Sequence, residues 1–319
     1  MTVAEAGKLN GRLGTVAEEK KGEYEAEGRP VRLDIEKGKI FADLRIGADV
    51  AGAVPLKANE GLSWQGVKLH GQGFLLEESV AKNLISKERP SERLLKKFYN
   101  GRDIAQDARN LWAIDAFGLS KRQLQEGHPL VFQHLLDRVK PERDQNNRAS
   151  YRENWWIFGE ARSDMRPAMA DVSKIIVTTR TAKHRLFSFI KSDTIPESGL
   201  VAIAIEDAWL LATLSSRWHV CWSLSAGGWL GVGNDPVYNN SKTFDPFPFP
   251  DPTEAQKAHL RLLGEQLDAH RKAQQAAHPK LTLTAMYNVL EKHCAKEPIS
   301  GKDREIYDQG LIRACGQST

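Results

Sequence analysis

The segment FDPFPFPDP, residues 244–252, constrains the fold of this chain more than any other feature. Its four prolines lack backbone N–H groups and hold the residues before them in extended conformations. Neither a helix nor a central strand can run through such a segment. It therefore predicts an extended connection between two regions of different secondary structure.

Helices are predicted after this segment. Residues Thr253 to Gln256 have the spacing of a capping box. Leucines then recur at the i, i+3 and i+7 spacing of a helix, at Leu260, Leu263 and Leu267. The pattern stops at His278-Pro279, which predicts one long amphipathic helix. Shorter helices are expected over residues 284–293 and from Ser300 to Gly310.

The region before the prolines mixes strands and helices. Short runs rich in β-branched or aromatic residues are predicted strands, namely LWAID at 111–115, WWIF at 155–158, KIIVTT at 174–179, LFSFI at 186–190 and VAIAI at 201–205. Helical patterns lie between them at 79–84 and 129–139. The predicted fold class is α+β, a mixed α/β domain followed by a helical region with a long amphipathic helix.

The N-terminal part of the chain is polar or broken by turn residues. The first forty residues, with the run EEKKGEYEAEGRP, indicate a flexible segment. Residues 39–74 alternate short apolar pieces with Gly and Pro, as short strands and turns do. We therefore predict a connecting segment with short strands over 1–75, a central domain over 76–252 and a helical region over 253–319.

The composition predicts a soluble protein of the cytoplasm. No apolar run approaches the roughly 18 residues of a membrane span, and the N-terminus lacks the apolar stretch of a secretory signal. The few cysteines, Cys221, Cys294 and Cys315, are widely spaced, which favours reduced thiols over disulfides or a zinc site. We expect no metal site.

The charges are segregated along the chain. Residues 76–192 hold 22 Lys and Arg against 15 Asp and Glu, whereas residues 193–252 hold 2 against 7. The segment from Val172 to Ser192 has five basic residues and no acidic one. Such a stretch suits contact with phosphate, although charge alone favours a solvated basic face.

Catalytic motifs are absent or incomplete. Adenine-N6 methyltransferases need an Asn/Asp-Pro-Pro-Tyr/Phe loop around the flipped base, and the nearest string is Asp235-Pro236-Val237-Tyr238. It lacks the second proline. The glycines just upstream, Gly228, Gly231 and Gly233, lie too close to it to form a separate cofactor loop. We interpret both as turn-forming structure and predict no catalytic or cofactor-binding residue.

Long strings of this chain resemble one enzyme family. They include PLKANEGLSWQGVKLHGQGF, YNGRDI, LWAIDAFGL, VKPERDQNNRASYRENWWIFGEARSDMRPAM, TTRTAKHRLFSFI, LSSRWHVCWSLSAGGWLGVGNDPVYN and FDPFPFP. The order and content of these strings are similar to the region after the catalytic domain in large single-chain class I DNA methyltransferases. That group includes the MmeI-like restriction-modification enzymes, and the resemblance spans nearly the whole chain.

The resemblance implies a DNA-reading function. The central region would be a target-recognition domain on double-stranded DNA, and S-adenosylmethionine would bind a separate methyltransferase domain or subunit that methylates adenine. The C-terminal helices are similar to the spacer helices of type I specificity subunits. An endonuclease partner and a role in restriction or phage defence are further expectations from the family.

Side chains with fixed donors read bases, whereas any basic group can contact phosphate. The residues predicted to contact DNA are Asn100, Arg102, Lys140, Arg143, Arg148, Arg152, Arg162, Arg166, Arg180, Lys183, His184 and Arg185. For each of the charged residues a structural salt bridge remains an alternative, and Asn100, Arg102 and Asp103 alternatively form a turn that Asp103 stabilises. Trp155 and Trp156, between these arginines, are expected in the core, and His219 and Trp222 are expected to pack in an apolar strand.

Two other functions remain open. The chain is alternatively a truncated or split methyltransferase chain that acts as a protein-interaction module or a remnant. A third hypothesis is that it methylates DNA itself through Asp235 to Tyr238.

Overall fold

The computed structural model describes residues 10–19, 31–41, 46–50, 52–230 and 235–310. Contacts divide the chain into two compact units, Met1–Val54 and Pro55–Thr319. The secondary structure of the larger unit mixes helices and sheets, which confirms the α+β class.

The smaller unit contains an antiparallel pair of strands, β1 (Gly11–Glu19) and β2 (Val31–Gly38). Apolar and charged residues alternate along VRLDI at the period of a strand, so one face carries apolar side chains that remain exposed. The prediction of a flexible segment was wrong for these two strands, because this alternation outweighs the polar composition. The rest of the polar run, residues 20–30, lies outside the described residues.

The larger unit contains twelve helices among its described residues. They are α1 (Glu78–Lys87), α2 (Gly101–Ala105), α3 (Lys121–Gly127), α4 (Pro129–Arg138), α5 (Lys140–Asp144), α6 (Ala149–Glu153), α7 (Met165–Ala170), α8 (Ala208–Ser215), α9 (Arg217–Ala226), α10 (Glu254–Ala277), α11 (Leu283–Cys294) and α12 (Gly301–Gly310). Shorter helical turns are η1 (Lys57–Asn59), η2 (Gln72–Phe74), η3 (Arg89–Leu94) and the π-helical turn η4 (Asn240–Phe244).

The strands that the structure describes in this unit form two four-stranded sheets and a short ribbon. The first sheet has the order β3 (Ser63–Gln65), β10 (Leu200–Ile203), β7 (Lys174–Thr179) and β8 (Phe187–Lys191), all antiparallel. The second has the order β4 (Leu75–Leu76), β6 (Trp112–Ile114), β5 (Leu95–Tyr99) and β9 (Ile195–Pro196). The ribbon pairs β11 (Gly228–Leu230) with β12 (Asp235–Val237).

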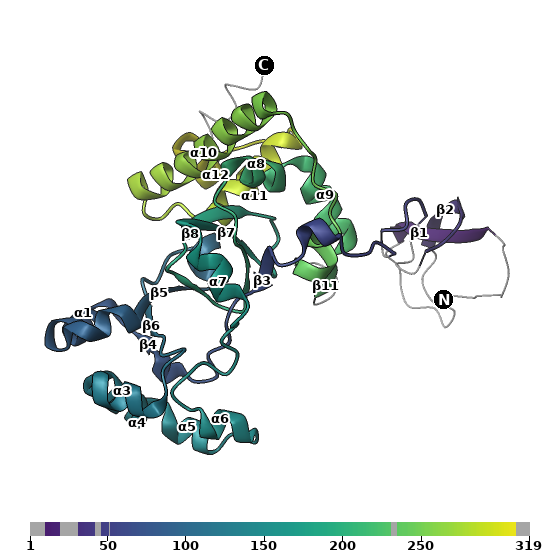
Figure 1. The fold of residues 1–319 in the computed structure, drawn as a ribbon. Helices are drawn as coiled ribbons and strands as arrows, with labels where there is room; N and C mark the ends of the chain where they lie inside the picture. The colour runs from purple at the N-terminus through teal and green to yellow at the C-terminus, as the bar shows by residue number, and fades with distance from the viewer. Residues whose placement is uncertain (1–9, 20–30, 42–45, 51, 231–234, 311–319) are drawn as a thin grey trace, which may run out of the picture. The chain divides into compact units, whose positions relative to one another are not determined.

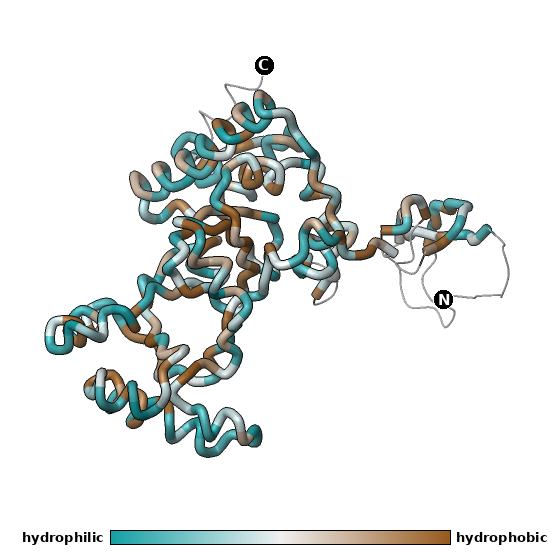
Figure 2. Tube along the Cα trace, viewed as in Figure 1, coloured by the Kyte–Doolittle hydropathy of each residue, from teal (hydrophilic) through white to brown (hydrophobic). Residues whose placement is uncertain are grey.

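The first sheet is covered on both faces, which explains why its strands read as nearly continuous apolar runs. Ile175 and Val177 of β7 point into a core shared with the second sheet and with α4 and α7. Ile176, between them, points into a separate core formed with α8 and the aromatic residues Tyr238 and Phe244. Figure 2 shows these hydrophobic strands in the middle of the larger unit, and Figure 1 shows α8 and α10 beyond β7 and β8 on the side away from α3 to α6.

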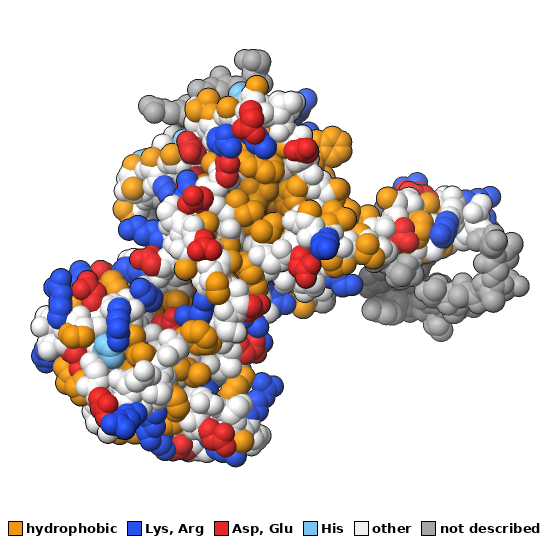
Figure 3. Space-filling model, in the orientation of Figure 1, with side chains coloured by type: hydrophobic (Ala, Val, Ile, Leu, Met, Phe, Trp, Pro, Cys, Tyr) orange, Lys and Arg blue, Asp and Glu red, His pale blue; other side chains and the backbone are white. Residues whose placement is uncertain are grey.

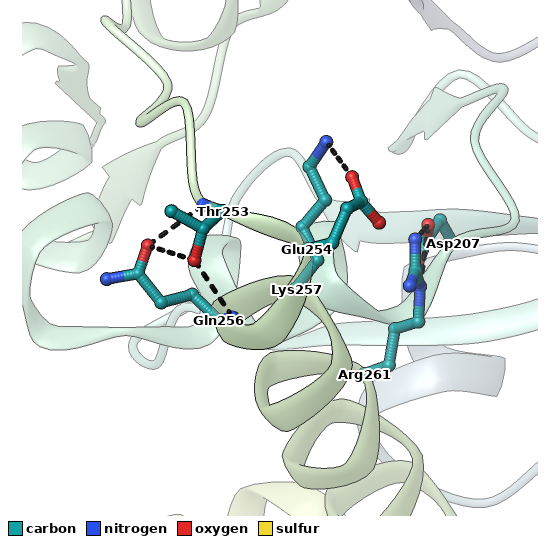
Figure 4. A network of polar contacts seen from close by, with 6 residues as sticks. All are labelled: Asp207, Thr253, Glu254, Gln256, Lys257 and Arg261. Atoms are coloured by element: carbon teal, nitrogen blue, oxygen red, sulfur yellow. Dashed lines mark hydrogen bonds and ion pairs between the residues drawn. The ribbon is translucent and has the colours of Figure 1, made fainter.

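The long helix α10 begins at the predicted capping box (Figure 4). The Gln256 side chain accepts a 2.9 Å hydrogen bond from the Thr253 N–H, and the Thr253 hydroxyl accepts from the Gln256 N–H. One turn later, Arg261 donates to Asp207 at 2.8 Å, and Asp207 also caps α8 by accepting from the Trp209 N–H. Burial by itself raises the pKa of Asp207, but these hydrogen bonds outweigh burial and leave the pKa below its ordinary value.

Further along, α10 supplies hydrogen bonds to the free edge of β8. Asp268 accepts from the Phe189 N–H at 3.1 Å. Arg271 donates to the Phe187 carbonyl at 2.7 Å, and Lys272 donates to the Phe189 carbonyl at 2.9 Å. An unpaired strand edge exposes donors and acceptors in a row, and here helix side chains take the place of a fifth strand.

The other strand and helix predictions have mixed outcomes. Four predicted strands are confirmed within two residues: 111–115 is β6, 174–179 is β7, 186–190 is β8 and 201–205 is β10. Four predicted helices are also confirmed: 79–84 lies in α1, 129–139 is α4, 284–293 is α11, and the last helix, from Ser300 to Gly310, is α12.

Two strand predictions were wrong. WWIF at 155–158 forms turns, with Trp155 buried in the core as expected and Trp156 half-buried, its indole N–H donating to the Leu119 carbonyl. The segment around His219 and Trp222 is the helix α9 rather than a strand, because the Ser216 side chain caps a helix there.

Residues 55–75 pack within the larger unit. The strand β3 pairs with β10, and Val67 and Phe74 are fully buried in the first core. The division into 1–75, 76–252 and 253–319 stays a prediction.

Candidate nucleic-acid interface

Basic residues are distributed over several elements of the larger unit. Figure 3 shows Lys and Arg side chains over α1 and around α3, with Asp and Glu side chains among them. The number of basic residues therefore says little about a binding surface, and the partners of each predicted contact residue decide whether it is available.

Arg143 on α5 is part of the interior. Only 1% of the residue is exposed, and its guanidinium donates to the backbone carbonyls of Leu69 and Ile157 at 2.8 and 2.9 Å. It also lies over the rings of Phe74 and Tyr151. Burial lowers the pKa of Arg143. The prediction of a DNA contact is corrected here, because a guanidinium held in this way cannot reach a phosphate.

Arg185, just before β8, is buried as well. Its guanidinium donates to the Thr179 and Pro236 carbonyls and lies 5.1 Å from the centre of the Tyr238 ring. Burial lowers its pKa to about 10, so it remains charged at neutral pH. Arg185 thus joins β7 to β12 and is also corrected from a DNA contact to a structural residue.

Arg166 and Arg162 are engaged by carboxylates. Arg166 forms a bidentate pair with Asp115, at 2.6 and 3.1 Å, and little of either side chain is exposed. Arg162 pairs with Glu160 at 2.8 Å and donates to the Gly66 carbonyl. The Arg166 pair and the Arg162 hydrogen bond to Gly66 both join segments distant in sequence. The salt-bridge alternative therefore fits these two arginines better than a free phosphate contact.

Lys183 and His184 both contact helix α11, although Lys183 remains exposed. Lys183 donates to Glu291 at 2.7 Å and to Asn288 at 3.0 Å. The His184 ring lies 2.8 Å from the same Asn288 oxygen. These contacts attach the C-terminal helices to the strand connection after β7.

Lys140, Arg148 and Arg152 lie on or beside the short helices α5 and α6. Lys140 is paired with Asp144 one turn away on the surface. Arg148 donates to the Tyr151 hydroxyl at 2.9 Å, and Arg152 donates to the Asn146 carbonyl, but both remain exposed. Such contacts exchange readily with solvent or phosphate.

Asn100, Arg102 and Arg180 lie close to one another at the C-terminal end of β7. The Asn100 side chain caps α2, with Asp103 completing a capping box, so it is a helix cap. Arg102 is exposed and Arg180 is half-buried, and neither guanidinium is hydrogen-bonded to another residue that the structure describes. Of the twelve predicted residues, these two arginines have the freest donors.

Two residues near Arg162 were missed by the sequence analysis. Lys68 donates to Glu160 at 2.7 Å, and His70 is exposed with a φ of 50°, a conformation that costs energy for any residue other than glycine. Burial, with the nearby Arg143, lowers the pKa of His70. Gly71 and Gly73, which follow His70, were the only signal, and they indicated a turn without showing which side chain would be exposed.

Tyr238 of the methyltransferase-like string is fully buried. Its hydroxyl lies 2.9 Å from the His219 ring, and its ring packs edge-on against Phe187. Burial raises the pKa of Tyr238 beyond its ordinary range and lowers that of His219 to about 3. Asp235–Val237 form the strand β12, which agrees with a structural role; Gly231 and Gly233 lie outside the described residues.

Comparison with known proteins gives this surface a context. The family model described as "MmeI, target recognition domain" matches residues 57–251. The chain belongs to this family. The target recognition domain contains all twelve predicted contact residues and ends within the proline-rich segment, just before α10.

A solved structure also shares the fold of the chain. The type IIL restriction-modification enzyme MmeI, in complex with DNA, matches with a TM-score of 0.63 and 18% identity over 93% of this chain. The chain spans 38% of the length of that enzyme. No curated protein matches the chain. Among the described residues, no helix combines the length and apolar character needed to cross a membrane.

Proposed function

We propose that the target recognition domain binds double-stranded DNA and reads its sequence for an adenine-specific, S-adenosylmethionine-dependent methyltransferase of a restriction-modification system. The methyltransferase residues would lie on another domain or subunit, and phage defence is the role expected for such a system. The observation that carries the proposal is the family match over residues 57–251, and the likeness in fold to DNA-bound MmeI supports it.

The surface offers several cations to DNA. Arg102 and Arg180 are unpaired among the described residues, and Lys140, Arg148 and Arg152 have only exposed, exchangeable partners. Each phosphate neutralised by such a group contributes about −0.9 to the slope of log K against log salt. If all of these groups contact phosphates, the slope is roughly −4 to −5.

The burial of Tyr238 supports the non-catalytic part of the proposal. Transfer to adenine needs an aromatic ring that stacks on a base flipped out of the duplex. A ring enclosed by Phe187, Arg185 and His219 cannot do so without opening the second core. We therefore expect no methyl transfer by the isolated chain.

Fluorescence anisotropy with a labelled duplex tests the binding. We expect affinity to fall steeply between 50 and 300 mM salt, and a selection from random duplexes to yield one enriched sequence. An affinity independent of salt contradicts DNA binding, and a selection without enrichment contradicts sequence reading.

Incubation of the pure chain with labelled S-adenosylmethionine and DNA tests the catalytic part. Methyl transfer by the pure chain would overturn the assignment of catalysis to another domain or subunit, and its loss in Tyr238→Ala, which removes the ring, would place it on this string.

A further inference from the structure

A groove of about 560 Å³ opens where the C-terminal end of β7 meets α2 and α11. Arg102 contributes to one wall, and Arg180 and Lys183, from the segment after β7, contribute to another. Thr284 of α11 also lines the groove, and its hydroxyl donates to the Ala105 carbonyl at 3.0 Å. Three basic side chains from two separate segments thus line one concave surface.

The carboxylates around this groove are already engaged. Glu197 accepts from the Ser198 hydroxyl and from the Gly199 N–H, at 2.7 Å for the latter, within its own turn. Glu291 pairs with Lys183 at 2.7 Å, and this pair lowers the pKa of Glu291. Because both of its donors are neutral, Glu197 keeps its charge in the groove. Arg102 and Arg180 are the lining cations that form no ion pair among the described residues.

The backbone that carries these two arginines is fixed. The Arg180 N–H donates to the Gly199 carbonyl at 2.8 Å, and the Arg180 carbonyl accepts from the Tyr238 N–H at 2.6 Å. The Arg102 N–H donates to the Asn100 side chain at 2.9 Å within the capping box of α2. A binding site on a fixed backbone loses less entropy when a ligand binds.

A second observation also indicates a polar ligand here. Thr179, the last residue of β7, lines the groove and is 2% exposed. Its hydroxyl has no hydrogen-bond partner among the described residues. Buried hydroxyls are nearly always hydrogen-bonded, so an acceptor or a water bound next to Thr179 would satisfy this one.

We propose that this groove binds a backbone phosphate of duplex DNA through Arg102 and Arg180. A phosphodiester has two unesterified oxygens that accept charge-assisted hydrogen bonds, and guanidinium groups match that geometry. The proposal rests on the DNA-binding function proposed above and assigns one specific contact within it. Such a contact positions the domain on the duplex and carries no sequence information.

The test compares two double variants of the full chain with equal loss of charge. Arg102→Ala/Arg180→Ala removes the groove cations. Lys302→Ala/Arg304→Ala removes two exposed cations on α12 and serves as the control. We measure affinity for one duplex from 50 to 300 mM salt, the affinity for an unrelated duplex, and the thermal unfolding midpoint of each variant.

The groove variant should lose about tenfold or more in affinity for both duplexes, as expected for charge-assisted hydrogen bonds. Its salt slope should become shallower by about 1, for one released phosphate contact. The α12 variant should retain the wild-type slope. Arg102→Lys/Arg180→Lys keeps both charges and should recover part of the affinity and of the salt slope. If the alanine variant has a lowered unfolding midpoint, the comparison of this lysine variant with the wild type replaces it as the test.

Failure of this inference is distinguishable from failure of the proposed function. If the groove variant and the α12 variant bind duplex DNA equally, with equal slopes, the groove does not hold a phosphate, although the domain binds DNA. If the wild-type chain binds no duplex, the proposed function itself is wrong.

Discussion

Replacing Asp268 by alanine should lower the free energy of unfolding of the larger unit by about 2–4 kcal/mol. Asp268 is 8% exposed and is the acceptor for the Phe189 N–H at the free edge of β8. Without it, that N–H is buried with no partner, a cost of about 1–3 kcal/mol. The substitution also removes the carboxylate that lies near the buried guanidinium of Arg271. Burial lowers the pKa of Arg271 to about 10, and the charge of Asp268 opposes that shift.

Two companion variants separate these contributions. Asp268→Asn keeps an oxygen for the Phe189 N–H and removes only the charge, so it should cost less than half as much as alanine. Lys272→Ala removes a side chain that is 54% exposed and should cost at most about 1 kcal/mol.

Urea denaturation followed by circular dichroism gives the three free energies. The alanine variant should also unfold roughly 4–12 °C below the wild type, and size-exclusion chromatography should detect association through the uncovered strand edge. An Asp268→Ala free energy within about 0.5 kcal/mol of the wild type, or an equally damaging Asp268→Asn, would show that Asp268 does not stabilise this edge.

Two further predictions concern α10 and the second core. A Cβ on Gly264 would lie 2.2 Å from the Ala208 carbonyl oxygen, so Gly264→Ala should cost about 1–3 kcal/mol despite the better helix propensity of alanine; an unchanged urea midpoint would contradict this. Burial, with a smaller contribution from Arg185, holds the pKa of His219 near 3, so the unfolded state takes up the proton first as the pH falls below about 6.5. The contribution of His219 to the free energy of unfolding is fully present above that pH and should fall by about 2 kcal/mol by pH 5. In His219→Gln, the free energy of unfolding should depend less on pH over this range.

The binding surface shows how little the sequence says about one basic residue. Arg102, Arg143 and Arg185 are equivalent as letters in a basic region. The first is exposed, whereas the other two are buried against carbonyls and aromatic rings. Sequence patterns report which side chains carry charge, but the availability of that charge depends on neighbours from distant segments, such as Leu69 for Arg143. The same limit concealed His70, whose display depends on its backbone conformation.

The helix α10 separates most clearly what each level determines. Its bounds follow from local chemistry, because the Thr253 capping box starts it and His278-Pro279 ends it, and the structure places it at Glu254–Ala277. Its pattern of Leu260, Leu263 and Leu267 predicted an apolar inner face. Yet Leu263 is 45% exposed, whereas Asp268 and Arg271 are buried. Only the tertiary structure decided this orientation, because the free edge of β8 presents backbone donors and acceptors that need polar partners.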